Sequence, residues 1–422
     1  MHGLLVVSDV HLCRLRPNMV RGGQHEFAGF LEHHTALRPG GRPWRLVING
    51  DLFDFDYQAE GLADRGPEAA SLALFGAVAD EFADVFRALG RFLDAGHEVV
   101  VIPGNHDIDL HWPSVRAAFR ARVATACERR RSDERLTFRD WFHYEPGRIF
   151  IEHGHRFDPD SHVAGLLAPF DAAGQMRSCL ATHWIAGFCH RIPELAYHVD
   201  HTLSPLSYVP MLLRRYGARA PVLWVQYLAF ALGTLRLAGR RQSTPDPRHE
   251  RALQALASEP GLSKVTVDAL ECAAAQPRLS SRGATAARLH VVPALLLPVA
   301  VVLATIAALA GSRPLGIAAA TLVLVVIATN VLVSGRYQGF AEENLRQGAR
   351  AVQRILGVPL VALGHVHVTT NEPAGSGRYL NSGTWMLSER PLSYLQIDEA
   401  GATVRGWEPQ EPESCNPHGI QW

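Results

Sequence analysis

Five short motifs rich in aspartate, asparagine and histidine occur along the chain, and each directly follows a short apolar run. The runs span residues 4–7, 45–48, 98–102, 148–151 and 359–363, and their length and composition predict buried strands. Because the carboxyl ends of adjacent strands border one crevice in an open α/β sheet, the motifs are predicted to meet at one site. In chain order they are Asp9-Val10-His11, Gly50-Asp51-Leu52-Phe53-Asp54, Gly104-Asn105-His106-Asp107, His153-Gly154-His155 and Gly364-His365-Val366-His367.

The donor atoms of these motifs favour a site for two divalent metal ions. Carboxylate, amide and imidazole donors without a cysteine suit a hard or borderline cation. Two ions held about 3.5–4 Å apart need a carboxylate that can bridge them, and Asp51 is the natural bridge. Such a pair lowers the pKa of a shared water and clamps a phosphoryl oxygen, so we expect hydrolysis of a phosphoester or pyrophosphate bond.

The order and spacing of the motifs resemble the calcineurin-like metallophosphoesterase superfamily, whose pattern is D-x-H, G-D-x-x-D, G-N-H-D/E, H and G-H-x-H. The resemblance covers roughly residues 1–160 and 355–407. It implies a four-layer α/β/β/α sandwich, and it gives His106 the role of an acid or phosphoryl stabiliser oriented by Asp54. It also implies two divalent ions, manganese first, with iron, zinc or nickel as alternatives. One ion would be held by Asp9, His11, Asp51 and His367, and the other by Asp51, Asn105, His153 and His365.

Three residues beside the motifs are predicted to contact the substrate, namely His155, Arg156 and His111. Each has a structural alternative. His155 could simply cap its loop, and His111 lies in the stretch 110–113, whose proline equally fits the entry to a helix. A single Asp-x-His or Gly-His-x-His would also more often be a turn or a satisfied histidine, but five motifs in family order favour the metal site.

Within the superfamily, three segments resemble the branch related to UDP-2,3-diacylglucosamine pyrophosphatases, which cleave a pyrophosphate in a lipid-linked nucleotide sugar. That branch commonly has arginine where His106 stands and a carboxylate where His155 stands. The resemblance therefore implies the reaction class more firmly than the substrate. The segments are GNHDIDLHWP at residues 104–113, WFHYEPGRIFIEHGHRFDP at residues 141–159 and YLNSGTW at residues 379–385.

The local pattern predicts alternating strands and helices over the first 160 residues. An apolar repeat from Phe75 through Phe82 to Phe92 predicts one helix that Gly96 closes. After Gly364, short strands are expected at residues 378–380, 393–397 and 402–406.

The composition sets outer limits on function. A hydrophobic fraction of 47% in 422 residues is ample for a large core and for further apolar segments outside it. A net charge of zero gives no reason to expect nucleic acid as a partner. The six cysteines show no paired spacing, which predicts reduced and mostly buried thiols consistent with the cytosol. The first residues lead directly into a strand, so secretion is not expected.

Two apolar segments in the middle of the chain predict a transmembrane helical hairpin. Residues 291–310 and 315–333 contain no charged residue, and each is about long enough to cross a ~30 Å hydrocarbon core. The alternative is a helix pair buried in a soluble dimer interface. Arginines flank the segments on both outer sides, which predicts that both ends and the catalytic domain face the cytoplasm of a bacterial inner membrane. These arginines are Arg278, Arg282, Arg288, Arg336, Arg346, Arg350 and Arg354.

A third apolar segment, residues 221–235, is shorter and is bracketed by Arg214, Arg215, Arg219, Arg236, Arg240 and Arg241. Because His153 precedes the hairpin and His365 follows it, while both are expected to bind one ion, an even number of crossings must separate them. We therefore predict an interfacial helix on the bilayer, with a buried core helix as the alternative. Residues 240–288 are predicted to be a cytoplasmic linker with one or two small helices.

The expected organisation is a metallophosphoesterase domain in two parts, residues 1–160 and 335–422, separated by a helical insertion and linker at 161–288 and the hairpin at 289–334. The expected substrate is a phosphoester or pyrophosphate compound that is linked to a membrane lipid. A tethered phosphodiesterase or phosphatase acting on a soluble nucleotide or phosphoprotein is the second enzyme hypothesis. A non-catalytic membrane scaffold is the hypothesis of another class, and the presence of His106 argues against it because a scaffold has no chemical need for this residue. The oligomeric state is left open.

Overall fold

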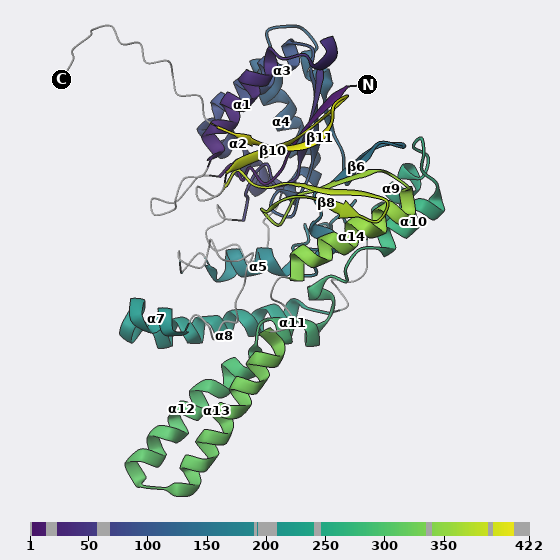
Figure 1. Cartoon of the computed structure of the whole chain (residues 1–422). Helices are drawn as coiled ribbons and strands as arrows, with labels where there is room; N and C mark the ends of the chain where they lie inside the picture. The colour runs from purple at the N-terminus through teal and green to yellow at the C-terminus, as the bar shows by residue number, and fades with distance from the viewer. Residues whose placement is uncertain are drawn as a thin grey trace, which may run out of the picture.

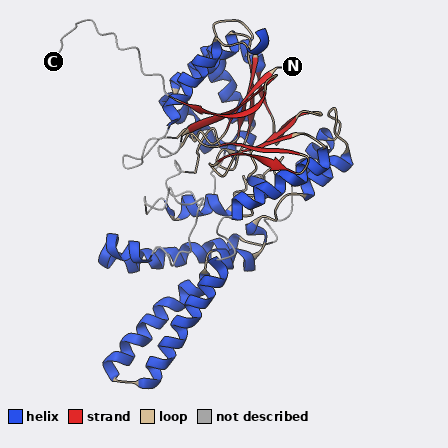
Figure 2. Ribbon diagram, in the orientation of Figure 1, coloured by secondary structure: helices blue, strands red, loops and turns tan. Residues whose placement is uncertain are grey.

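Two β-sheets face each other and carry helices on their outer faces (Figure 1, Figure 2). The computed structural model describes residues 2–13, 23–56, 68–189, 192, 209–239, 246–334, 340–386 and 391–408. Four residues used in the expectations above, Arg240, Arg241, Arg336 and Cys415, lie outside these ranges. The layers confirm the predicted α/β/β/α sandwich.

The first sheet has the strand order β11-β10-β1-β2-β3-β4. Successive side chains along a strand point to opposite faces of the sheet. Leu4 and Val6 of β1 therefore lie between the two sheets, while Leu5 and Val7 pack under helices. Strands β1 to β4 are parallel, and β10 joins β1 in antiparallel fashion. The bounds are β1 (Gly3–Val7), β2 (Trp44–Asn49), β3 (Glu98–Ile102), β4 (Leu136–Phe138), β10 (Leu392–Asp398) and β11 (Gly401–Trp407).

The second sheet has the order β5-β6-β7-β9-β8, with β6, β7 and β9 parallel at its centre. Apolar residues of both sheets, among them Val100 of β3 and Ile151 of β6, form the buried layer between them. All five strands predicted to precede the motifs are therefore confirmed within a residue or two. The bounds are β5 (Phe142–Glu145), β6 (Ile149–Glu152), β7 (Leu360–Leu363), β8 (Thr369–Ala374) and β9 (Gly377–Ser382).

Helices α1 (Glu26–Thr35), α2 (Glu68–Glu81), α3 (Ala83–Asp94) and α4 (Pro113–Ala126) cover the first sheet. The prediction of one helix from Phe75 to Phe92 was wrong in one respect. Phe82 has non-helical backbone angles, φ −105° and ψ 40°, and divides the stretch into α2 and α3. The apolar repeat gave no sign of this break because Phe82 stays buried in the same core as its neighbours.

Helices α9 (Pro247–Leu256), α10 (Lys264–Cys272) and α14 (Phe340–Leu356) cover the second sheet. The first two are small helices within residues 240–288, as predicted, but they pack on the sheet and do not form a free linker. Leu253 of α9 and Val267 and Leu270 of α10 are buried with Val361 of β7 in one apolar cluster. Residues 247–272 therefore belong to the outer helical layer of the sandwich.

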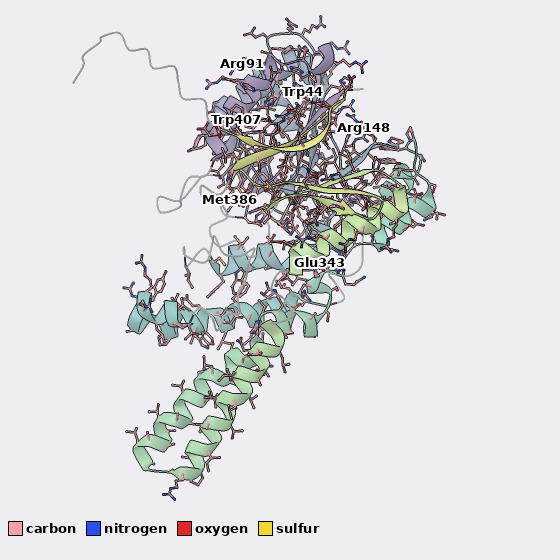
Figure 3. The ribbon with its side chains drawn as sticks, in the orientation of Figure 1. Trp44, Arg91, Arg148, Glu343, Met386 and Trp407 are labelled. Atoms are coloured by element: carbon pink, nitrogen blue, oxygen red, sulfur yellow. The ribbon has the colours of Figure 1, made fainter. Side chains whose placement is uncertain are left out.

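The remaining helices form the insertion, which lies on one side of the sandwich (Figure 1). Helices α12 and α13 form an antiparallel hairpin that extends away from the rest of the molecule, and their side chains project into open space, whereas side chains fill the region between the sheets (Figure 3). The bounds are α5 (Leu180–Gly187), α7 (Val209–Tyr216), α8 (Ala220–Leu237), α11 (Arg282–Arg288), α12 (Val291–Ala310) and α13 (Arg313–Ser334).

Three helical stretches of the described chain are long and apolar enough to cross a membrane: Leu212–Leu237, Val291–Ala310 and Arg313–Leu332. The second and third are the predicted hairpin. Their outer surfaces are apolar and exposed, with Leu309 at 84% and Ile317 at 69% of full exposure. A surface of this kind needs an apolar environment, which suggests membrane association.

One acidic residue connects the root of the hairpin to the catalytic sandwich. Asp160 lies five residues after His155, and its carboxylate accepts from the Arg278 guanidinium at 2.8 Å and from that of Arg288. Arg288 ends α11, directly before the hairpin begins. The backbone N–H of Arg278 also donates to the carbonyl of Pro159 at 2.7 Å. These contacts hold the start of the hairpin against the loop that follows a predicted metal ligand.

Candidate metal centre

The predicted ligands lie in the loops that follow β1, β2, β3, β6 and β7, so both sheets contribute to one site. Hydrogen bonds tie these loops together across the gap between the sheets. The backbone N–H of His365 donates to Asp9 Oδ2 at 3.0 Å, and the N–H of Asp9 donates to the carbonyl of Gly50 at 3.2 Å. His153 Nδ1 donates to the carbonyl of Asn49 at 2.9 Å, which leaves Nε2 as its ligand atom.

Two glycines in the motifs allow the loops to approach each other. Gly50 has φ +81°, and a Cβ atom there would lie 2.4 Å from the ring of His153. A Cβ atom on Gly104 would lie 2.1 Å from Asp51 Oδ1. Any side chain at either position would displace a predicted ligand, which explains why glycine precedes the ligands in these motifs.

Left-handed backbone is concentrated at the predicted ligands. Within the described residues, seven that are not glycine have positive φ, and five of them are Asp9, His11, Asp51, His365 and His367. This conformation costs about 1–3 kcal/mol per residue and persists only where the surroundings enforce it, most often at functional sites. The rest of the fold therefore maintains strained backbone at these residues, and this strain directs their side chains toward one site.

The first cluster contains Asp9, His11 and His367, which are all buried. Nε2 of His11 and Nε2 of His367 lie 3.3 Å apart, and Nε2 of His367 lies 3.2 Å from Asp9 Oδ1. The other ring nitrogen of His11, Nδ1, lies 3.2 Å from Asp54 Oδ2. Two imidazole nitrogens directed at one carboxylate form a donor set that fits a divalent cation.

The second cluster contains Asp51, His153 and His365, and Asn105 lies beside it. Nε2 of His153 is 3.0 Å from Asp51 Oδ2 and 3.3 Å from Asn105 Oδ1. The same Asp51 oxygen lies 4.0 Å from Nε2 of His11 in the first cluster. Asp51 thus stands between the two clusters, where a bridging carboxylate is required.

His106 lies next to the first cluster, with its ring edge-on to His11 at a centroid distance of 4.9 Å. Its Nδ1 is 3.3 Å from Asp54 Oδ1 and 3.2 Å from Asp56 Oδ2, so two carboxylates orient the ring. Sequence reasoning identified Asp54 and missed Asp56. Asp56 also accepts from the Thr182 hydroxyl of α5 at 3.1 Å, which connects the insertion to this part of the site.

Two further carboxylates outside the predicted ligand set, Asp158 and Asp107, support the ligands. Asp158 Oδ2 lies 3.1 Å from Nε2 of His365, which leaves Nδ1 of that ring as the ligand atom. Asp107 accepts from the backbone N–H groups of Gly104 at 2.6 Å and Leu52 at 2.8 Å. It therefore fixes the loop after β2 against the loop after β3. The last letter of G-N-H-D was the available signal for Asp107.

The three residues predicted to contact substrate have different surroundings. His155 is buried near His153, at a ring-centroid distance of 5.3 Å, and neither ring nitrogen has a hydrogen-bond partner among the described residues. Arg156 is 1% exposed, donates to Glu152 and to the Leu270 carbonyl, and stacks on Trp141, while its Nη2 atom has no hydrogen-bond partner among the described residues. His111 is buried 3.9 Å from Asp140, and this contact does not join it to the clusters.

Comparison with known proteins agrees with this site. The family model for calcineurin-like phosphoesterases matches residues 3–219, just over half of the chain, and the chain belongs to that family. A comparison with curated proteins found no match. The protein is therefore a metallophosphoesterase, a metal-dependent phosphoester hydrolase. The match ends before His365 and His367, and the fold brings these two residues to the site.

The buried charges of the site predict competition between protons and metal ions. Burial alone would lower the pKa of His153, but the charges of Asp51 and Asp9 outweigh it and raise this pKa to about 9. The pKa of His11 is raised in the same way by Asp54 and Asp9, against the effect of burial. At neutral pH these rings carry protons that a cation must displace, so metal binding releases protons.

We expect Mn²⁺ affinity to fall progressively as the pH is lowered below about 9, the raised pKa of His153 in the folded protein. Calorimetric titrations in buffers of different ionisation enthalpy would measure the released protons. The metal-free protein should behave oppositely, because the stabilisation from protonated His153 is complete below pH 6.5 and is lost as the pH rises through about 9. Binding without proton release near neutral pH would contradict this account.

Proposed function

We propose that the protein hydrolyses a phosphoester or pyrophosphate bond in a membrane-lipid-linked substrate, with its catalytic domain on the cytoplasmic side of an inner membrane. The observation that carries this proposal is the pairing of a metallophosphoesterase site with an exposed apolar hairpin in one chain. An anchored site can meet an amphiphile that never leaves the bilayer. A UDP-linked diacylated sugar is the first substrate to test, because of the three segments that resemble that branch.

Two divalent cations, when bound, polarise a phosphoryl oxygen and make water nucleophilic near neutral pH. Asp9, His11, Asp51 and His367 would hold one, and Asp51, Asn105, His153 and His365 the other. In the metal-free protein the charges of Asp54 and Asp51 outweigh burial and raise the pKa of His106 to about 9, which favours the protonated ring. Asp54 and Asp56 hold Nδ1, so Nε2 points away from them and can donate a proton to the leaving oxygen.

His155 is the residue we assign to the phosphate group among those outside the metal ligands. A buried imidazole without a partner on either nitrogen is costly, and a substrate oxygen or an ordered water would satisfy it. Burial and the neighbouring His153 lower the pKa of His155, so this ring is neutral and can donate one hydrogen bond. We do not assign substrate contacts to Arg156 or His111.

We expect the hairpin to cross the membrane twice, with the turn near Arg313 on the far side. A single cysteine at Ser312, introduced into a variant without the six native cysteines, should react with an impermeant thiol reagent added to intact spheroplasts. The matched control is a cysteine at Ser281, which is exposed at the start of α11 and should react only after lysis. Labelling of Ser281 alone would reverse the orientation.

The substrate proposal predicts a preference for long acyl chains. Each buried methylene contributes about 0.8 kcal/mol, so three of them would raise kcat/KM roughly fiftyfold over a water-soluble analogue with the same headgroup. The measurement compares both substrates with the full chain reconstituted in lipid nanodiscs. Equal efficiency on both would favour a tethered enzyme for a soluble nucleotide or phosphoprotein. If neither the lipid substrate nor its soluble analogue were hydrolysed, the substrate proposal would fail, and a chromogenic phosphodiester would then test the hydrolase activity alone.

A further inference from the structure

Helix α8 has two opposite apolar faces. Tyr227, Ala231 and Thr234 are buried on one side of it. On the other side, Val222 is 56% exposed, Val225 64% and Leu232 41%, and Ala229 is exposed between them. These four residues are spaced by three and four positions and therefore form one stripe, which we call the outer stripe of α8. The buried face fits the sequence-based alternative of a core helix, and the outer stripe fits the prediction of an interfacial helix.

The contacts of α8 determine which way the outer stripe points. Trp184 of α5 and Phe188, which directly follows α5, pack on Tyr227 with ring-centroid distances of 5.8 and 5.3 Å. Since Thr182 of the same short helix reaches Asp56 in the metal centre, the buried face of α8 points toward the catalytic domain. The outer stripe points the opposite way. In Figure 1, α8 runs across the root of the hairpin, which extends on the side away from the sheets.

The start of the hairpin is fixed to α8. The indole N–H of Trp224 donates to the carbonyl of Ala294 at 3.1 Å, and the hydroxyl of Tyr227 donates to the carbonyl of Leu289. The first turns of α12 are therefore held beside α8, and on them Val292 and Leu295 are 54% and 42% exposed. Both α8 and the start of the hairpin thus expose apolar side chains next to this junction.

The charged residues around the outer stripe indicate what kind of environment the stripe contacts. Residues 209–239 contain four arginines and no aspartate or glutamate. Arg214, Arg215 and Arg219 are exposed before the stripe, and Arg236 is exposed after it. An exposed apolar stripe with cations at both ends fits an interface between hydrocarbon and anionic headgroups.

We propose that the outer stripe of α8 lies in the surface layer of the bilayer, parallel to the membrane plane, with its arginines among anionic lipid headgroups. The proposal rests on the hairpin being inserted as described under the proposed function. It treats α8 as a lipid-surface contact, although the stretch Leu212–Leu237 is long enough to span. A third crossing would separate His153 from His365, which share one cluster, and it would remove Tyr227 from α5.

Depth-dependent fluorescence quenching tests the proposal in the full chain. Single cysteines replace Val225 on the outer stripe, Ile306 in α12 or Ser281 in α11, and each carries the same fluorophore in nanodiscs containing shallow or deep spin-labelled lipids. We expect Val225 to be quenched more by the shallow label, Ile306 more by the deep label, and Ser281 by neither. Anionic lipid should increase the shallow quenching at Val225 at least about twofold over neutral lipid. Replacing Arg214, Arg215 and Arg219 by Gln should abolish that difference.

The outcomes separate this proposal from the one it rests on. No quenching at Ile306 would mean that the hairpin is not inserted, and the proposed function would fail with it. Deep quenching at Ile306 without quenching at Val225 would overturn only the surface contact. Stronger quenching of Val225 by the deep label would make α8 a spanning helix. Crosslinking of Val225 cysteines between two chains, with no effect of the lipid label, would show that a second copy covers the stripe.

Discussion

Replacing Asp51 by Asn should lower kcat on the order of a thousandfold or more while the protein stays folded. Asp51 Oδ2 faces both ligand clusters, at 3.0 Å from His153 and 4.0 Å from His11, so loss of its charge weakens both ion positions at once. Removal of a single electrostatic contact in a transition state already costs about 10²–10³ in kcat. An asparagine can keep the hydrogen bond that Asp51 Oδ1 accepts from the His106 N–H at 2.8 Å.

The measurements for Asp51→Asn are turnover of a chromogenic phosphodiester, metal content by elemental analysis, and thermal unfolding. Asp268→Asn is the matched control, because Asp268 is an exposed carboxylate on α10 that pairs with Lys264. It should leave kcat and metal content unchanged. An Asp51→Asn protein that holds two ions and turns over at the normal rate would refute the bridging role.

His106→Asn should lower kcat by about 10²–10⁴, the usual contribution of a general acid, and leave the metal content intact. Asp54 and Asp56 orient Nδ1 of His106, and the proposed part of this ring in the reaction is to supply a proton to the leaving oxygen. As the pH rises, the imidazolium loses this proton and activity falls, so the alkaline limb of the kcat profile should disappear in the variant. The bound cations move that limb below the metal-free pKa of about 9.

A surface histidine provides the control for His106→Asn. His33 is exposed on α1, and His33→Asn should change neither kcat nor its pH dependence. Asp56→Asn separates positioning from proton supply, because it removes one of the two carboxylates that orient the ring. It should lower kcat less than His106→Asn does and keep the alkaline limb. If His106→Asn lost metal to the same extent as Asp51→Asn, His106 would be a ligand.

Much of the metal centre was predictable because its ligands follow strands that are recognisable from local sequence. The run Glu98–Ile102 coincides with β3, and the alternation of Leu4, Leu5, Val6 and Val7 between two cores follows from the strand period alone. Once these strands are parallel, their carboxyl ends must lie at one edge, and the motifs gather there. The positions of the loops that carry the ligands could therefore be predicted from local sequence alone.

The residues that sequence reasoning missed depend on contacts between distant segments. Asp158 supports His365 across the whole insertion, and no local pattern specifies that pairing. The apolar spacing in α9 and α10 predicts helices but does not say that β7 is the surface they cover. Arg156 was placed near substrate because it follows a motif, whereas its side chain lies under α10. Adjacency in sequence was a poor guide to which way a side chain points.

The position of β7 in the chain also fixes the order in which the protein can become active during synthesis. β7 is the middle strand of the second sheet and pairs with β6, yet the insertion and the hairpin are made between them. His365 and His367 emerge from the ribosome after α12 and α13. No nascent chain can therefore complete either ligand cluster before the apolar hairpin has been synthesised, so the metal centre can form only after the whole insertion has been made.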